Sequence, residues 1–150
     1  MVKPQNQIPN LPCLCASFRR AARALTQLYD EALRPLGLLT TQFTVIQALS
    51  LAGEVTQGRL GEILAMDSTT LTRTLATMRK RRWIETRHGR DERERLLKLS
   101  KTGREQLERA SPAWQGVQDL LRSELGDERW AEIFRQTTEI TSAARAKSLF

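Results

Sequence analysis

Hydroxyl and guanidinium side chains are concentrated between Ser68 and Arg82, in a segment whose apolar residues recur at helical spacing. Leu71, Leu75 and Met78 are four and three residues apart, which places them on one side of a helix. The polar residues around the rest of this helix are Ser68, Thr69, Thr70, Thr72, Arg73, Thr77, Arg79 and Lys80. A threonine hydroxyl donates or accepts a hydrogen bond, and an arginine can make two hydrogen bonds to guanine. These side chains are therefore candidates to read base edges in the major groove of DNA, with the basic residues at the helix end assigned mostly to phosphates.

The arginines that follow this segment lie in a predicted β-hairpin. Residues 83–86 alternate in polarity, residues 95–99 do so in part, and residues 88–91 supply the turn, with Gly89 free to adopt a positive φ. The candidate DNA contacts in the hairpin are Arg90, Arg93 and Arg95. Narrow A·T tracts attract guanidinium groups, so the tip of the hairpin is predicted to reach the minor groove. His88 is expected to be solvated or to face phosphate.

The charge of the chain favours a polyanionic partner. The 150 residues carry a net charge of +7, and the stretch from Arg73 to Arg95 holds nine basic residues against four acidic ones. Each phosphate that a protein neutralises releases condensed counterions, which favours nucleic-acid binding. A charge run taken alone is more often a solvated face. A single histidine excludes a His-rich metal site within one chain, and no Ser-His-Asp set or glycine-rich phosphate loop is found, so we expect neither an enzyme nor a cofactor.

Apolar, capping and breaking residues predict a mainly α fold with a small β-hairpin wing. The first helix is a long amphipathic one over about residues 12–34. The second is capped by Thr40 or Thr41, the third spans about 56–64, the fourth spans 68–82 after an Asp67 cap, the fifth starts at Ser100 and is kinked or interrupted at Pro112, and the last follows Asp127. No stretch approaches the roughly 20 apolar residues that span a bilayer, and the N-terminus lacks a secretory signal. We therefore expect a cytoplasmic protein with no membrane partner.

Three stretches resemble the MarR family of bacterial transcriptional regulators: LGLLTTQFTVIQAL (36–49), LGEILAMDSTTLTRTLATMRKRRWIE (60–85) and DERERLLKLSKTGRE (91–105). The third is similar to the wing signature of that family, an Asp and an Arg two apart, then a strand, then a Leu-Ser pair and a glycine that opens the next helix. Those residues here are Asp91, Arg93, Leu99, Ser100 and Gly103. The resemblance covers nearly the whole chain and implies a winged helix-turn-helix.

The resemblance also implies a domain plan and partners. Residues 1–150 would form one MarR-like domain, with a flexible arm at 1–11, dimerisation helices at 12–35 and 101–147, and a DNA-binding lobe at 41–99. The protein would be a homodimer on a pseudo-palindromic double-stranded operator with half-sites about 10 bp apart. It would be a repressor released by a small aromatic ligand or by thiol oxidation. The alternatives are a non-specific architectural DNA-binding protein and a helical protein–protein adaptor with a solvated basic face.

Cys13 and Cys15 are candidates for the groups that sense the signal for release from DNA. Many MarR-family members bind aromatic acids, while one branch senses organic hydroperoxides through a cysteine near the start of the first helix, which tyrosines hydrogen-bond. Cys15 lies at a similar distance from the Leu-Gly pair of the following loop, and Tyr29 stands where one of those tyrosines would. The chain departs from that pattern in having Thr40 for the second tyrosine and Arg19 for an aromatic residue.

The residues themselves leave the role of the thiols open. A thiol near a helix N-terminus, with Arg19 and Arg20 one turn on, is favoured as the thiolate. Its oxidation to a sulfenic acid would allow a disulfide with Cys13 or with a partner-chain cysteine. Alternatively, a buried cysteine serves as a small apolar residue, or the pair supplies two thiolate ligands to a metal, although two further ligands are not visible nearby.

Overall fold

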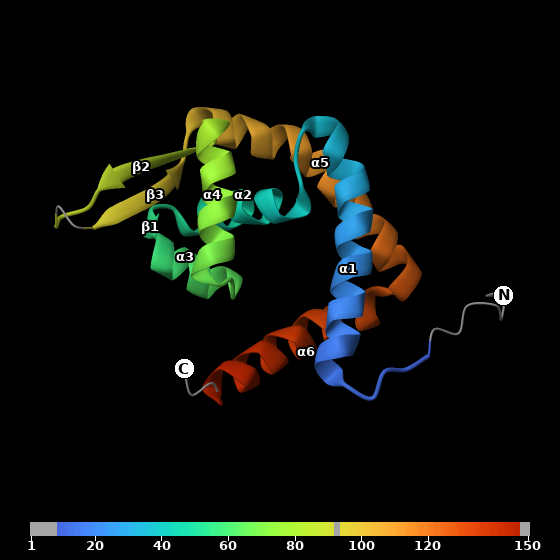
Figure 1. The fold of residues 1–150 in the computed structure, drawn as a ribbon. Helices are drawn as coiled ribbons and strands as arrows, with labels where there is room; N and C mark the ends of the chain where they lie inside the picture. Colours follow the sequence, from blue (N-terminus) through green and yellow to red (C-terminus); the bar gives the residue numbers. More distant parts are fainter. Residues whose placement is uncertain (1–8, 92–93, 148–150) are drawn as a thin grey trace. The chain divides into compact units, whose positions relative to one another are not determined.

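The computed structural model describes residues 9–91 and 94–147. Its elements are α1 (Leu14–Leu33), the 3-10 helix η1 (Arg34–Leu36), α2 (Thr40–Ala52), β1 (Val55–Thr56), α3 (Gln57–Leu64), α4 (Ser68–Lys80), β2 (Ile84–His88), β3 (Arg95–Leu99), α5 (Lys101–Leu125) and α6 (Asp127–Ala146). Helices dominate, and one small sheet accompanies them, as Figure 1 shows. The predicted fold class, mainly α with a β-hairpin wing, is confirmed.

The chain divides into two compact units, residues 1–111 and residues 112–150. The first unit holds α1 to α4, the sheet and the start of α5, while the second holds the rest of α5 and α6. Helix α5 is continuous from Lys101 to Leu125 with Pro112 inside it, so the predicted interruption is wrong. A proline removes one helical N–H and crowds the preceding turn, but the helix continues across it.

An acidic side chain of α1 caps the start of α2. The expected cap, Thr40 or Thr41, is wrong, because the N-cap position is Leu39, which has no side-chain acceptor. Asp30 Oδ1 accepts instead from the backbone N of Thr40 at 2.7 Å and from Thr40 Oγ1 at 2.6 Å. Gln42 Oε1 accepts from the backbone N of Leu39 at 3.0 Å. The end of α1 and the start of α2 are thereby held together by a part-buried carboxylate.

The core of the first unit lies between α2, α3, α4 and the sheet. The side chains there that are essentially inaccessible to solvent are Leu33, Leu38, Phe43, Val45, Ile46, Leu49, Leu60, Leu71, Leu75, Met78 and Leu97. This set includes the three apolar residues predicted to face inward from the fourth helix. Burial of such side chains contributes about 1.5–3 kcal/mol each, so this core fixes the position of α4.

Three antiparallel strands form the sheet in the order β1-β3-β2. Strands β2 and β3 pair from Ile84 opposite Leu99 to His88 opposite Arg95, and the hairpin projects from the helices of its unit (Figure 1). Strand β1 is a two-residue strand that the sequence pattern did not predict, because two residues cannot display an alternation. Gly89 lies just past β2 and does not adopt a positive φ, so that expectation is wrong.

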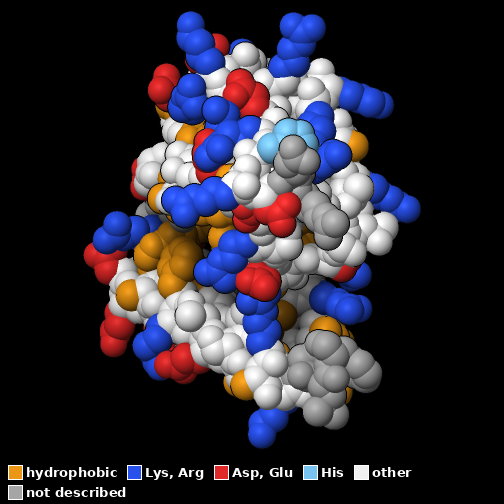
Figure 2. All heavy atoms as spheres, turned by 90° about the vertical axis from the view of Figure 1, so that its left-hand side faces the viewer, with side chains coloured by type: hydrophobic (Ala, Val, Ile, Leu, Met, Phe, Trp, Pro, Cys, Tyr) orange, Lys and Arg blue, Asp and Glu red, His pale blue; other side chains and the backbone are white. Residues whose placement is uncertain are grey.

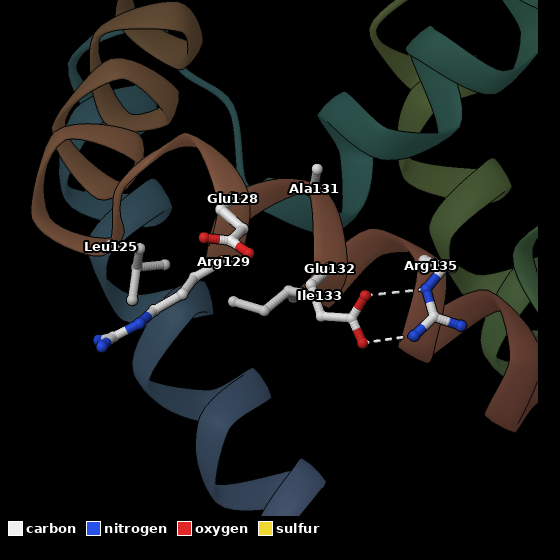
Figure 3. Close-up of a pocket in the computed structure, with 7 residues that line it drawn as sticks. All are labelled: Leu125, Glu128, Arg129, Ala131, Glu132, Ile133 and Arg135. Carbon is white, nitrogen blue, oxygen red and sulfur yellow. Dashed lines mark hydrogen bonds and ion pairs between the residues drawn. The ribbon is translucent and has the colours of Figure 1, made fainter.

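In the second unit, α5 and α6 meet at Gly126, whose φ of 80° suits a residue without a side chain. Trp130 and Phe134 stack edge to face with ring centroids 5.1 Å apart, but no described residue of α6 is buried. A hollow of about 710 Å³ opens beside the start of α6. Its lining includes Leu125, Ile133 and the hydrogen-bonded pair of Glu132 and Arg135, which Figure 3 draws.

Among the described residues, no single helix is long and apolar enough to cross a membrane, although the bent pair of Leu14–Leu36 and Thr40–Ala52 reaches the required length and composition when taken together.

Candidate nucleic-acid interface

Helices α3 and α4 form the helix-turn-helix, and each begins with a side-chain cap. Thr56 Oγ1 accepts from the backbone N of Arg59 at 3.1 Å, and Asp67 Oδ1 accepts from the backbone N of Thr70 at 2.9 Å. The predicted Asp67 cap is thereby confirmed. Between the helices Ala65 takes the left-handed conformation, with φ 50° and ψ 39°. The turn is tight, since a side-chain carbon at Gly61 would lie 3.3 Å from the carbonyl oxygen of Met66.

The outer face of α4 carries every helix residue that we predicted to contact DNA. Its inner face buries Leu71, Leu75 and Met78 against the core. The predicted contact residues of α4, all exposed to solvent, are Ser68, Thr69, Thr70, Thr72, Arg73, Thr77, Arg79 and Lys80. One amphipathic helix thus separates the residues that hold it in place from those that can reach a ligand.

Hydrogen bonds within the protein already engage part of this outer face. The Thr70 hydroxyl donates to Asp67 Oδ2 at 2.6 Å, so it belongs to the cap. Gln57 Nε2 donates to Thr72 Oγ1 at 2.9 Å and ties this predicted DNA contact to the start of α3. The described residues include no hydrogen-bond or ion-pair partner for the guanidinium of Arg73. Gln57 was missed from the sequence, because nothing in its local pattern marks a glutamine at a helix start as a partner of another helix.

Helix α4 ends two residues earlier than predicted, at Lys80. Arg82 has a φ of 59°, its backbone N donates to the carbonyl of Arg79 at 2.9 Å, and the N of Trp83 donates to the carbonyl of Met78 at 3.0 Å. These two hydrogen bonds form a Schellman motif, in which the helix ends at a residue in the left-handed conformation that is usually glycine. Because an arginine occupies this position, the sequence did not predict the helix end.

The hairpin exposes a second set of basic side chains. Arg90 and Arg95 are exposed, whereas Arg93 lies outside the described residues. Figure 2 faces the hairpin side of the molecule and shows numerous Lys and Arg side chains there, with acidic side chains among them. Arg87 pairs with Glu54, which follows α2, so Arg87 braces the hairpin and its guanidinium is engaged. His88, at the end of β2, is exposed, as expected for a solvated or phosphate-facing residue.

Two carboxylates at this site are stabilised in their ionised form. The hydrogen bond from Arg87 lowers the pKa of Glu54 below its usual value. The hydroxyl and backbone N–H of Thr70 lower the pKa of Asp67. Both acids therefore carry their charge at neutral pH and serve as structural partners of the elements that face the predicted ligand.

We predict that Asp67→Asn flattens the acid limb of the stability curve. A carboxylate with a lowered folded-state pKa stabilises the fold above its unfolded pKa, about 3.9, and this contribution is lost as the pH falls through the folded value. Asparagine keeps the cap but does not titrate. Urea unfolding midpoints between about pH 6 and about pH 2 should therefore fall less steeply for Asp67→Asn than for the wild type, and parallel curves would contradict the assignment.

The two cysteines lie at the start of α1. Both are exposed in the single chain and neither forms a disulfide, so the alternative of a buried apolar cysteine is not found there. No group of three or more metal-binding side chains occurs among the described residues. Tyr29 is half-buried, and this burial raises the pKa of its hydroxyl. Tyr29 and Cys15 are fourteen residues apart on one helix, or about 21 Å at the helical rise, so no hydrogen bond joins them within one chain.

A capped helix pair packed on a core, followed by a basic antiparallel hairpin, defines a winged helix-turn-helix protein. The MarR family model matches residues 36–94. The M. tuberculosis transcriptional regulator MosR, solved in complex with DNA, is similar at 39% identity with a TM-score of 0.82, over 91% of this chain and 99% of MosR. The chain belongs to the MarR family of winged-helix transcriptional regulators.

A further relative and a further solved structure are similar to the chain. The HTH-type transcriptional regulator YwoH of Bacillus subtilis is 28% identical over 115 residues, which is 77% of this chain and 84% of YwoH. A mutant of MarR from E. coli, complexed with operator DNA, has the same fold, with a TM-score of 0.76 over 85% of this chain and 92% of that one at 24% identity.

Proposed function

We propose that this protein is a homodimeric regulator that binds a specific double-stranded operator and represses transcription in the cytoplasm. The observation that carries the proposal is the outer face of α4, defined above, where exposed threonines and an unengaged Arg73 lie opposite a fully buried apolar face. Such a helix fits the major groove with its first turns toward the bases. The MosR complex, solved with DNA at 39% identity, supports the same mode of action.

The proposed DNA contacts come from two elements, α4 and the hairpin. The first two turns of α4, from Ser68 to Arg73, would contact base edges, while Thr77, Arg79 and Lys80 near the helix end would contact the backbone. Arg90, Arg93 and Arg95 of the hairpin would reach the adjacent minor groove.

Exposed apolar side chains on the terminal helices support the homodimer. On α1 the side chains of Leu14, Phe18 and Leu25 are 62%, 38% and 42% exposed. On α5 and α6, respectively, Leu120 and Phe134 are exposed at 50% and 54%. Monomeric proteins rarely expose large apolar groups in such runs. We therefore assign residues 12–35 and 101–147 to dimerisation and residues 41–99 to DNA binding, with 1–11 as an arm.

A competition titration tests specific recognition. The protein is bound to labelled DNA from upstream of its own gene and is displaced with either the same DNA or an unrelated duplex of equal length. We expect unlabelled cognate DNA to compete at least about 10³-fold better. Equal competition would favour the architectural alternative, and an affinity that does not change with salt would favour the protein–protein adaptor.

Sedimentation of the free protein should give the mass of two chains, and a single-chain mass would refute the homodimer.

Release of the operator is proposed to follow from a small aromatic ligand or from oxidation of the thiols. A hydroperoxide would oxidise the Cys15 thiolate to a sulfenic acid, with the peroxide reduced to an alcohol. Condensation with a second thiol would then form a disulfide and release water. The exposure of both cysteines supports this chemistry, and Tyr29 could contact Cys15 only from the other chain of a dimer.

We predict that cumene hydroperoxide weakens operator binding by the wild type but not by Cys15→Ser, because serine cannot form a sulfenic acid. Affinity is measured with and without peroxide, and Cys13→Ser serves as the matched control that retains the reactive thiol. If Cys15→Ser is still released, oxidation of this thiol is not the signal. Parallel titrations with salicylate test the aromatic-ligand alternative.

A further inference from the structure

A hollow beside the cysteines is lined by arginines. It measures about 400 Å³, and its walls include Cys13, Cys15, Arg19, Arg20 and Arg23. No acidic side chain is among the described residues that line it. The first acidic residue of the whole sequence is Asp30, so the 29 residues before it carry four basic side chains and no negative one.

Helical spacing places the thiol of Cys15 and the guanidinium groups of two arginines in one row along α1. Cys15, Arg19 and Arg23 follow each other at intervals of four residues on α1, so their Cβ atoms are about 5–6 Å apart from one to the next. Side chains on a helix lean toward its N-terminus, which carries each guanidinium toward the thiol end of the row. Neither Arg19 nor Arg23 has an ion-pair partner among the described residues.

The segment before α1 runs beside the hollow, and its Leu11 is part of the lining. Arg20 Nη1 donates to the carbonyl of Pro9 at 2.8 Å, and Ser17 Oγ donates to the carbonyl of Leu11 at 3.3 Å. These two bonds fold the chain back along the first turns of the helix. In the single chain the thiols therefore sit in a concave site with an excess of positive charge. Helical spacing places the row of Cys15, Arg19 and Arg23 on a different side of α1 from the exposed apolar residues that we assign to dimerisation, so the row can stay open in a dimer.

We propose that this hollow, defined as the arginine–cysteine hollow, receives small carboxylate-bearing disulfides and directs them onto Cys15. Guanidinium groups pair with carboxylates through two parallel hydrogen bonds, and fixed charges of one sign raise the local concentration of oppositely charged reactants. The Cys15 thiolate attacks one sulfur of the bound disulfide. A new sulfur–sulfur bond forms to Cys15, the old one breaks, and the leaving thiolate carries away the electron pair and takes a proton from water. The inference deepens the thiol control proposed above and names its effector class.

Two disulfides of the same length and opposite charge provide the test. Dithiodipropionate carries two carboxylates and cystamine carries two ammonium groups. The rate of mixed-disulfide formation on Cys15 is followed by mass spectrometry in a Cys13→Ser background, with and without the double change Arg19→Gln and Arg23→Gln. The ratio of the anion rate to the cation rate should be at least about tenfold higher with the arginines present, and the difference should shrink in about 1 M salt.

A matched control removes the same charge elsewhere in the first unit. Arg34→Gln with Arg59→Gln changes η1 and α3 and should leave the rate ratio near that of the parent. An unchanged ratio in Arg19→Gln/Arg23→Gln, or an equal fall in both double variants, overturns the inference. Operator binding is measured separately on the modified protein. Charge-selective modification that leaves operator affinity intact would refute thiol control of DNA binding and leave the selectivity of the hollow established.

Discussion

Replacement of Gly103 by alanine is expected to lower the free energy of unfolding by about 2 kcal/mol. A Cβ at this position would lie 2.0 Å from the carbonyl oxygen of Trp83 and 3.0 Å from its carbonyl carbon. Both are backbone atoms, so the helix start itself has to move. Overpacking of this kind costs about 3 kcal/mol at the upper end, and the better helix propensity of alanine offsets about 1 kcal/mol of it.

The junction at Gly103 holds the hairpin to α5, which is why the effect should be large. The Ser100 hydroxyl donates to the carbonyl of Arg82 at 2.6 Å and accepts from the backbone N of Gly103 at 2.9 Å. The backbone N of Ser100 donates to the carbonyl of Trp83 at 3.0 Å. A shift of α5 would strain all three hydrogen bonds and thereby the end of α4. This close approach gives a physical reason for a glycine at the start of this helix.

Gly116 is the matched control, since it lies in the same helix and a Cβ added there would have no neighbouring atom within 4 Å. Gly116→Ala should raise the free energy of unfolding by about 0.5–1 kcal/mol through the lower conformational entropy of the unfolded chain. Urea titrations followed by circular dichroism compare the two variants. If both variants change the free energy of unfolding in the same direction, the contact with Trp83 does not determine the effect of Gly103→Ala.

Arg73→Ala is expected to weaken binding to the cognate operator by about 1–3 kcal/mol and to relax base preference at one position in each half-site. Arg73 is exposed in the second turn of α4, and no described residue engages its guanidinium. Its removal therefore leaves no buried partner unsatisfied, and the lost affinity reports on contacts to DNA.

Lys80→Ala is the control on the same helix. Lys80 lies in the last turn, where a phosphate contact is expected, so its loss should weaken binding to all sequences alike and reduce the salt slope by about one. Affinities are measured for the cognate operator and for its single-base variants. An equal loss on every sequence for Arg73→Ala would show that it contacts the backbone and not a base.

The local sequence was sufficient to predict most of α4 and the hairpin. The spacing of Leu71, Leu75 and Met78 identified the buried face of α4, and the Asp67 cap is confirmed at 2.9 Å. The hairpin strands were also predicted close to their observed bounds. These features depend on contacts within about four residues or on simple alternation, and both are visible in a single sequence.

Partners that are distant in the sequence escaped prediction. Asp30 caps α2 from another helix, Gln57 holds Thr72 across fifteen residues, and Arg87 pairs with Glu54 across 33 residues. Each involves an ordinary polar residue in an unremarkable local pattern. Only the tertiary packing of helices, loop and sheet brings these side chains together.

The order of helices, the faces of α4 and the basic hairpin were determined by the sequence alone, because periodicity and capping act locally. The tertiary structure decided which hydroxyls and arginines remain open to a ligand and which are engaged by the protein. It also decided that the apolar residues of α1 stay exposed and that the cysteines share a hollow with three arginines. Exposure and charge environment depend on every neighbouring element at once, so no single stretch of residues contains them.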